Sequence, residues 1–172
     1  MTLGPLSLPA DGLVVLVGIA GSGKSTFAAR HFPADAVLSS DAFRGLVAGD
    51  PSDQSATDDA FLLLHQALDM RLTRGLLTVV DATNVQPWAR EKLVEIARRR
   101  RRRAAAIVLG LPLAICLERN ASRTAGRLPL TAIRRQDRSL RHSIRDLEAE
   151  GFNPVHRLTD AASVDRIRLE FG

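Results

Sequence analysis

A glycine-rich stretch that holds one lysine, Gly18–Thr26, has the residue types and spacing of a phosphate-binding loop. It reads Gly-Ile-Ala-Gly-Ser-Gly-Lys-Ser-Thr and fits the pattern G-x-x-x-x-G-K-[ST]. In this pattern backbone N–H groups surround phosphate oxygens, the lysine reaches the β- and γ-phosphates, and the next hydroxyl coordinates Mg²⁺. The sequence therefore predicts a site for ATP or another nucleoside triphosphate with Mg²⁺. Ser25 is the expected metal ligand, Lys24 the catalytic cation, and the nucleotide contacts are Gly21, Ser22, Gly23, Lys24, Ser25 and Thr26.

A strand-to-helix turn with a chance lysine is the alternative explanation of this stretch. Only two of the 24 Lys and Arg residues are lysines, yet one of them, Lys24, occupies the slot that the pattern reserves for lysine. A slim ammonium suits phosphoryl transfer there, whereas a planar guanidinium has a different geometry. The phosphate-binding interpretation is therefore favoured.

Two aspartates stand just after predicted strands, Asp41 after 36–39 and Asp81 after 76–80. Ligands of open parallel sheets bind outside the carboxyl ends of the strands, so both carboxylates are expected near the phosphate-binding loop. One can act as a base toward an acceptor hydroxyl, and the other can organise the water shell of the metal. Asp41 also fits an N-cap of the following helix, and the two roles are compatible. Arg44, three residues later, can hold a phosphate of the acceptor.

Three arginines at four-residue spacing, Arg119, Arg123 and Arg127, are expected to belong to a lid over about residues 119–130. If the helix that contains Arg119 continued, the three would share one face. Arginines on a lid can stabilise the charge of a transferring phosphoryl group, so we expect catalytic roles for them. A solvated basic helix face is the alternative.

Motifs of other nucleotide-binding classes are missing. Asp81 is followed by Ala-Thr-Asn, with no adjacent glutamate to activate a hydrolytic water, and no guanine-reading Asn-Lys-x-Asp occurs. These absences favour a kinase over a motor ATPase or a GTPase.

The order of the predicted elements indicates an α/β fold of the P-loop kinase type, with a central parallel sheet, helices on both faces and an arginine-bearing lid. Residues 1–172 are expected to form a single domain, and residues 1–12 a leader. Strands are expected at 13–17, 36–39, 76–80, 104–109 and 155–158, and helices over 27–31, 42–48, 57–74, 87–98, 113–123, 131–150 and 164–170.

The composition is that of one globular domain, with 172 residues, 45% of them hydrophobic, and a formal net charge of +5. No stretch approaches the roughly 20 apolar residues of a membrane span, and the N-terminus lacks a signal-peptide pattern. A cytoplasmic protein without membrane contact is therefore expected. The only cysteine, Cys116, excludes an intramolecular disulfide and is expected to be a buried thiol.

The basic excess favours polyanionic partners, although a nucleotide alone could satisfy it. The run Arg98–Arg103 is expected to be a solvated helix end rather than a nucleic-acid patch. Trp88 is expected to be a packing residue rather than a platform on which a base stacks.

Five blocks occur together in one order: Gly18–Thr26, Leu38–Asp41 with Arg44–Val47, Asp53–Ser55, Thr78–Asn84 and Glu118–Asn120. This combination resembles the kinase domain of bacterial polynucleotide kinase-phosphatase, over about residues 13–170. The resemblance implies a polynucleotide 5′-hydroxyl-kinase, which transfers the γ-phosphate of ATP to 5′-OH ends of RNA or DNA. Such modules usually occur within RNA repair enzymes, so the chain is expected to be a stand-alone kinase or part of a larger phosphatase- and ligase-type repair protein.

The resemblance also implies roles for individual residues. Asp41 would be the general base on the 5′-OH, and Arg44 would hold the neighbouring phosphate of the acceptor strand. The lid residues over the nucleotide would be Arg119, Arg123 and Arg127. Candidate substrate-binding residues in the shared blocks are Arg44, Gln54, Asp81 and Asn84.

Two other functions stay open. The chain could be a P-loop kinase for a small-molecule hydroxyl acceptor, such as a sugar, a nucleoside or an antibiotic. It could also be a nucleotide-gated regulatory module that hydrolyses ATP slowly. The acceptor separates the first from a polynucleotide kinase, and dependence of phosphate transfer on any acceptor separates the second.

Overall fold

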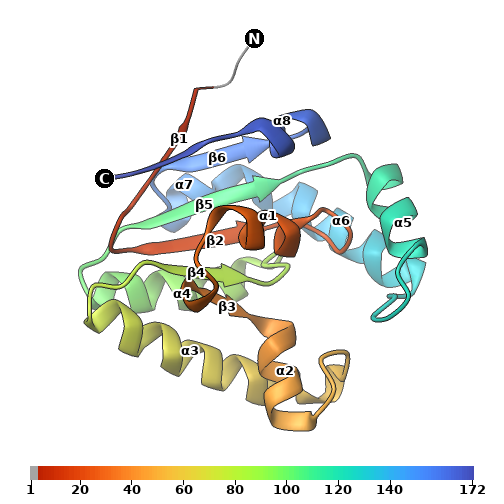
Figure 1. Cartoon of the computed structure of the whole chain (residues 1–172), viewed down its shortest axis with the longest axis horizontal. Coiled ribbons are helices and arrows are strands. Elements are labelled where there is room, and N and C mark those ends of the chain that lie inside the picture. The colour runs from red at the N-terminus through yellow and green to blue at the C-terminus, as the bar shows by residue number, and fades with distance from the viewer. Residues whose placement is uncertain (1–3) are drawn as a thin grey trace.

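A parallel sheet of five strands organises the computed structural model, which describes residues 4–172 (Figure 1). All neighbouring strands in it are parallel. In the spatial order β3-β4-β2-β5-β6 they are Val37–Ser39, Thr78–Asp81, Leu13–Val17, Ala104–Leu109 and Val155–Leu158. The predicted α/β fold of the P-loop kinase type is confirmed.

Helices lie on both faces of this sheet (Figure 1). They are α1 Lys24–His31, α2 Ser40–Ala48, α3 Thr57–Thr73, α4 Pro87–Arg99, α5 Leu113–Ala121, α6 Leu130–Ser143, α7 Leu147–Glu150 and α8 Ala161–Arg166. Short 3₁₀ turns occur at Ala34–Ala36, Gln54–Ala56 and Ile144–Asp146. Within residues 4–172 no helix combines the length and the apolar character that a membrane crossing requires.

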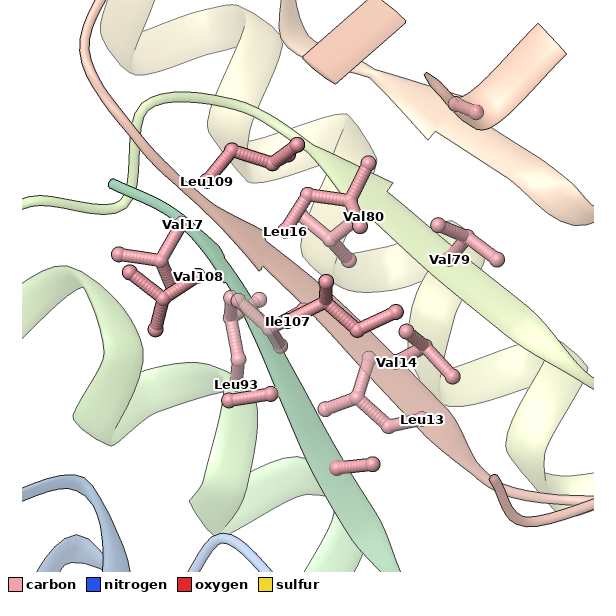
Figure 2. Close-up of a cluster of buried hydrophobic side chains, with 14 of the residues drawn as sticks. Leu13, Val14, Leu16, Val17, Val79, Val80, Leu93, Ile107, Val108 and Leu109 are labelled. Atoms are coloured by element: carbon pink, nitrogen blue, oxygen red, sulfur yellow. The ribbon is translucent and has the colours of Figure 1, made fainter. Parts of the chain in front are cut away.

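The core is built on β2 and β5, whose residues are all buried, as expected for strands covered on both faces. Figure 2 shows side chains of β2, β4 and β5 packed together with Leu93 of α4. Helix α3 contributes Leu64, Leu68 and Leu72, which are fully buried. Cys116 is also buried, as expected, and burial raises the pKa of its thiol.

The two chain ends differ from the prediction. The predicted leader contains β1 Leu6–Leu8, which pairs in parallel with β7 Leu169–Phe171; residues 1–3 of that leader lie outside the described part of the chain. The predicted helix over 164–170 is therefore wrong in its second half. Pairing between strands so distant in sequence leaves no local signal, which explains why both were missed.

The long helix expected over 131–150 is divided into α6, a 3₁₀ turn and α7. The break follows Ser143, whose backbone carbonyl accepts a hydrogen bond from Arg90 at 3.3 Å and whose hydroxyl donates to the carbonyl of Val85 at 2.8 Å. These tertiary bonds compete with the helical ones at this position.

The arginine run Arg98–Arg103 lies at the end of α4, as expected, but it is more than a solvated helix end. Asp69 of α3 accepts hydrogen bonds from Arg99 at 3.0 Å and from Arg100 at 2.8 and 2.5 Å. The bond from Arg100, with further help from Arg99, lowers the pKa of Asp69 to about 2. Arg99 and Arg100 thus tie the end of α4 to α3, which reduces the charge that the run offers to a polyanion.

Candidate active site

The glycine-rich stretch forms a loop between β2 and α1, as predicted. Gly21 and Gly23 have φ angles of 83° and 94°, in the left-handed region that glycine adopts without strain. A side chain on Gly21 would overlap the backbone carbonyl of Cys116 in α5. The loop is therefore closely packed against α5, and its N–H groups and the N-terminus of α1 can surround a phosphate group.

Lys24, the first residue of α1, points back across the loop and is only 8% exposed. Its Nζ donates to the carbonyl of Ile19 at 3.0 Å. Burial lowers the pKa of Lys24 to about 8; the carboxylate of Asp81 opposes this shift and the guanidinium of Arg123 adds to it. The ammonium is thus held at the loop in a poorly hydrated setting, where a phosphate would strongly favour its charged form.

Asp81 lies beside Ser25, the expected metal ligand. Strand β4 ends at Asp81 next to β2, with Leu16 as its partner in the register, and the Ser25 hydroxyl donates to Asp81 Oδ2 at 2.7 Å. A hydroxyl and a carboxylate are hard oxygen donors that suit Mg²⁺, which commonly keeps several waters and takes its remaining ligands from phosphates. The two residues fit such an ion. The position of Asp81 favours metal organisation over the direct substrate contact considered from the sequence.

Asp41 and Arg44 form a pair on the first turns of α2. Arg44 Nη1 lies 2.5 Å from Asp41 Oδ1, and Arg44 Nε donates to Thr57 Oγ1 at 3.2 Å. The N-cap of α2 is Ser39, whose hydroxyl accepts from the N–H of Ala42, so the alternative of Asp41 as N-cap is wrong. The Asp41 carboxylate is 69% exposed, whereas Arg44 is largely buried.

The sheet order arranges these groups along one edge. The phosphate-binding loop follows β2, Asp81 ends the neighbouring strand β4, and Asp41 follows β3, in which Ser39 is the partner of Asp81. Since neighbouring strands are about 4.8 Å apart, β3 lies roughly 10 Å from β2. At the carboxyl edge of the sheet, the phosphate-binding loop is thus followed by the metal-binding pair Ser25 and Asp81, and then by the candidate base Asp41.

The three predicted lid arginines do not share a helical face. Helix α5 ends at Ala121, so Arg119 belongs to the helix, while Arg123 and Arg127 belong to the loop that follows. Arg119 Nη1 would lie 3.3 Å from a Cβ placed on Gly23, which puts its guanidinium against the phosphate-binding loop. Arg127 donates to the carbonyl of Arg123 at 3.3 Å. Arg119 thus lies at the phosphate-binding loop, whereas the hydrogen bond from Arg127 stays within the lid itself.

A pocket of about 260 Å³ lies beside the loop and is bounded on its far side by α8. An ion pair of 3.0 Å between Arg30 and Asp165 joins α1 to α8 at this pocket. Sequence reasoning missed the contribution of α8, because nothing in its local pattern points to a ligand. The lining residues are Gly21, Gly23, Thr26, Phe27, Arg30, Arg119, Arg123, Val164 and Asp165.

Two further candidates have different surroundings. Asn84 is buried, with a φ of 49°, and its amide donates to the carbonyl of Leu16 at 2.8 Å, so it links the ends of β4 and β2. Gln54 is exposed, and its backbone carbonyl accepts a hydrogen bond from the hydroxyl of Thr57 at 2.7 Å, which places Gln54 near Arg44.

Trp88, at the start of α4, is 72% exposed, so the prediction of a packing role for it is wrong.

Comparison with known proteins agrees with this fold. Residues 13–143 match a protein-family model described as "AAA domain". No curated protein matches the chain. Among solved structures, the gluconokinase of Sinorhizobium meliloti 1021 is similar with a TM-score of 0.56 at 22% identity, and the match covers 92% of this chain and 94% of that chain.

The Mycobacterium tuberculosis APS kinase CysC, in complex with AMPPNP and APS, is similar with a TM-score of 0.56 at 20% identity, over 92% of this chain and 93% of that chain. A chain in the structure of the Pnkp1/Rnl/Hen1 RNA repair complex is similar with a TM-score of 0.68 at 22% identity. That match covers 84% of this chain but only 47% of the other. At these identities the likeness establishes the shared fold.

Proposed function

Because the chain belongs to the AAA-domain family, we propose that it is an ATP-dependent kinase that phosphorylates a hydroxyl group of an acceptor bound beside Asp41. The observation that carries this proposal is the order of groups along the sheet edge. Lys24 stands at the phosphate-binding loop, Ser25 and Asp81 form the metal-binding pair next to it, and Asp41 follows one strand further. Kinases require a nucleotide site, a metal site and an acceptor site in such proximity.

In this mechanism the loop N–H groups and Lys24 hold the phosphates. Ser25 and Asp81 would hold Mg²⁺, which would supply positive charge beside the phosphate oxygens. Asp41 accepts the proton of the acceptor hydroxyl while the oxygen of that hydroxyl forms a bond to the γ-phosphorus. The bond from the γ-phosphorus to the bridging oxygen breaks, and ADP leaves with that electron pair. Arg119 and Arg123 supply positive charge above the loop, where negative charge develops.

A small hydroxyl-bearing acceptor is the first candidate. The similar gluconokinase and APS kinase each correspond to this chain over more than 90% of both lengths. The candidate base is exposed beside a largely buried arginine. Such a pair can receive a small molecule whose hydroxyl reaches Asp41 and whose anionic group lies near Arg44.

A polynucleotide 5′-OH end is the second candidate, favoured by a basic surface on α6. Three arginines of this helix, Arg134, Arg135 and Arg138, are exposed, and no salt bridge within residues 4–172 involves them. Together with the lid arginines they can contact phosphates of a strand whose end lies at Asp41. The similarity to a chain of the RNA repair complex supports the same acceptor. Membership of a larger repair protein stays a prediction.

One labelling experiment tests the proposal and separates its two candidates. The protein is given γ-labelled ATP and Mg²⁺ with matched oligonucleotides that carry a 5′-OH or a 5′-phosphate, and in parallel with a panel of sugars and nucleosides. Label on the 5′-OH oligonucleotide alone supports the polynucleotide acceptor, and label on a small molecule supports the first candidate. Release of free phosphate at the same rate with and without any acceptor, in protein that binds ATP, would refute the kinase.

Asp58→Asn is a matched control for Asp41→Asn in this assay. Asp58 is an exposed aspartate in the first turn of α3, so its substitution makes the same charge change without touching the candidate base. Transfer should persist at the wild-type rate with Asp58→Asn and be strongly slowed with Asp41→Asn.

A further inference from the structure

Gln136 of α6 contacts the phosphate-binding loop directly, although 116 positions separate it from its partner. Its side-chain carbonyl Oε1 accepts a hydrogen bond from the backbone N–H of Ala20 at 2.9 Å. The loop binds phosphate through such N–H groups, so a bond to one of them bears on how the loop presents its donors.

The contacted N–H lies at the end of the loop where the terminal phosphate is expected. Lys24, whose side chain reaches the β- and γ-phosphates in loops of this type, donates to the carbonyl of Ile19 at 3.0 Å. Ile19 immediately precedes Ala20. The carbonyl that accepts from Lys24 and the N–H that donates to Gln136 therefore belong to one trans peptide group and point in opposite directions. Lys24 and Gln136 thus hold this peptide group of the loop from opposite sides.

The lid is fastened at its base to the helix that carries Gln136. Asn120, which is buried, donates from Nδ2 to the carbonyl of Leu128 and accepts at Oδ1 from the N–H of Leu128, both at 3.0 Å. These two hydrogen bonds close the loop 122–129, and α6 begins directly after it at Leu130. Helix α6 therefore connects the base of the lid to the phosphate-binding loop, through Leu128 at one point and Gln136 at the other.

We propose that Gln136 is a positioning residue that couples the arginine-bearing lid to the phosphate-binding loop, so that the grip on the terminal phosphate of the nucleotide depends on its bond to Ala20. The inference rests on the proposed kinase function, because it assumes that the loop receives a nucleoside triphosphate. It predicts a selective effect: loss of the bond weakens the binding of a triphosphate more than that of a diphosphate.

The test measures the affinities for ADP and for a non-hydrolysable ATP analogue, by calorimetry in the presence of Mg²⁺. Gln136→Met keeps the length of the side chain but removes its acceptor, and it should reduce the affinity for the analogue about threefold to tenfold, the size expected for one hydrogen bond. The affinity for ADP should change less than twofold. Gln136→Glu keeps an acceptor for the Ala20 N–H but adds a negative charge beside the phosphate-binding loop. Because ATP carries more negative charge than ADP, this variant should also reduce the affinity for the analogue more than that for ADP.

Gln86→Ala is the matched control. Gln86, which precedes α4, donates a hydrogen bond at 2.9 Å to the hydroxyl of Ser139 in α6, the helix that carries Gln136. This variant therefore removes another contact that holds α6 in place, without touching the phosphate-binding loop. The ratio of the two affinities should stay at the wild-type value. An equal loss for both nucleotides in Gln136→Met, or the same change of ratio in Gln86→Ala, would overturn the proposal.

Nucleotide binding, rather than phosphate transfer, is the readout. Protein that binds both nucleotides but phosphorylates no acceptor would therefore contradict the kinase function and still decide the role of Gln136. Protein that binds neither nucleotide would refute both.

Discussion

Lys24 should make nucleotide binding depend on pH near 8, well below the range in which an exposed lysine titrates. Burial lowers its pKa from 10.5 to about 8, and only the charged ammonium attracts a phosphate. One pH unit above the pKa, about a tenth of the molecules carry the charge. The affinity for a nucleotide should therefore be about tenfold lower at pH 9 than at pH 7, which corresponds to roughly 1.4 kcal/mol of binding free energy.

The assay is a titration with a fluorescent nucleoside diphosphate between pH 7 and 9.5, without added magnesium. The chain offers a matched control, since its other lysine, Lys92, is half-exposed and pairs with Glu95. Lys92→Met should preserve the profile, whereas Lys24→Met should bind weakly at every pH. Asp81→Asn removes a carboxylate that raises the pKa of Lys24, so the pH midpoint of the loss of nucleotide affinity should move below 8.

Two results would refute this reasoning. One is an affinity of the wild-type protein that stays constant from pH 7 to 9.5. The other is a Lys24→Met variant whose nucleotide affinity depends on pH as steeply as that of the wild-type protein, because the titrating group would then be a different one.

Three further predictions concern the candidate base, the loop and the fold. Asp41→Asn should slow phosphate transfer roughly 10²–10⁴-fold at unchanged nucleotide affinity, and equal rates would contradict its role as base. Gly21→Ala should reduce nucleotide affinity at least about tenfold, because a Cβ has no space there, whereas Gly49→Ala, with a similar φ of 76° but open surroundings, should not. Glu150→Ala should lower the melting temperature by roughly 10 °C, since it leaves the fully buried Arg90 without its carboxylate at a cost of about 3–5 kcal/mol; an unchanged melting temperature would contradict this.

The residue pattern of the chain was enough to predict the chemistry of the nucleotide site and the class of fold. The run of β2 followed by the glycine-rich loop and α1 is local in sequence, and its spacing specifies backbone geometry that few other residue patterns permit. The alternation of apolar segments with amphipathic helices likewise predicted a parallel sheet. Asp41 and Asp81 were found because ligand sites of such sheets lie at strand ends.

Tertiary structure alone decided which groups meet. The strand order places Asp81 between the loop and Asp41, and only then does its bond to the Ser25 hydroxyl identify a metal-binding pair. Similarly, the contact of Gln136 with Ala20 depends on how α6 packs against the sheet edge. Local periodicity predicts that a helix forms and which face it buries, but not which distant side chain it faces.

The arginines illustrate the same limit. The most conspicuous basic run, Arg98–Arg103, contains residues paired with Asp69, whereas Arg119 lies against the phosphate-binding loop. Charge is visible in a sequence, but its neutralisation depends on carboxylates that the fold brings from other elements. The availability of a charged group is therefore a property of the packed molecule, while its presence is a property of the chain.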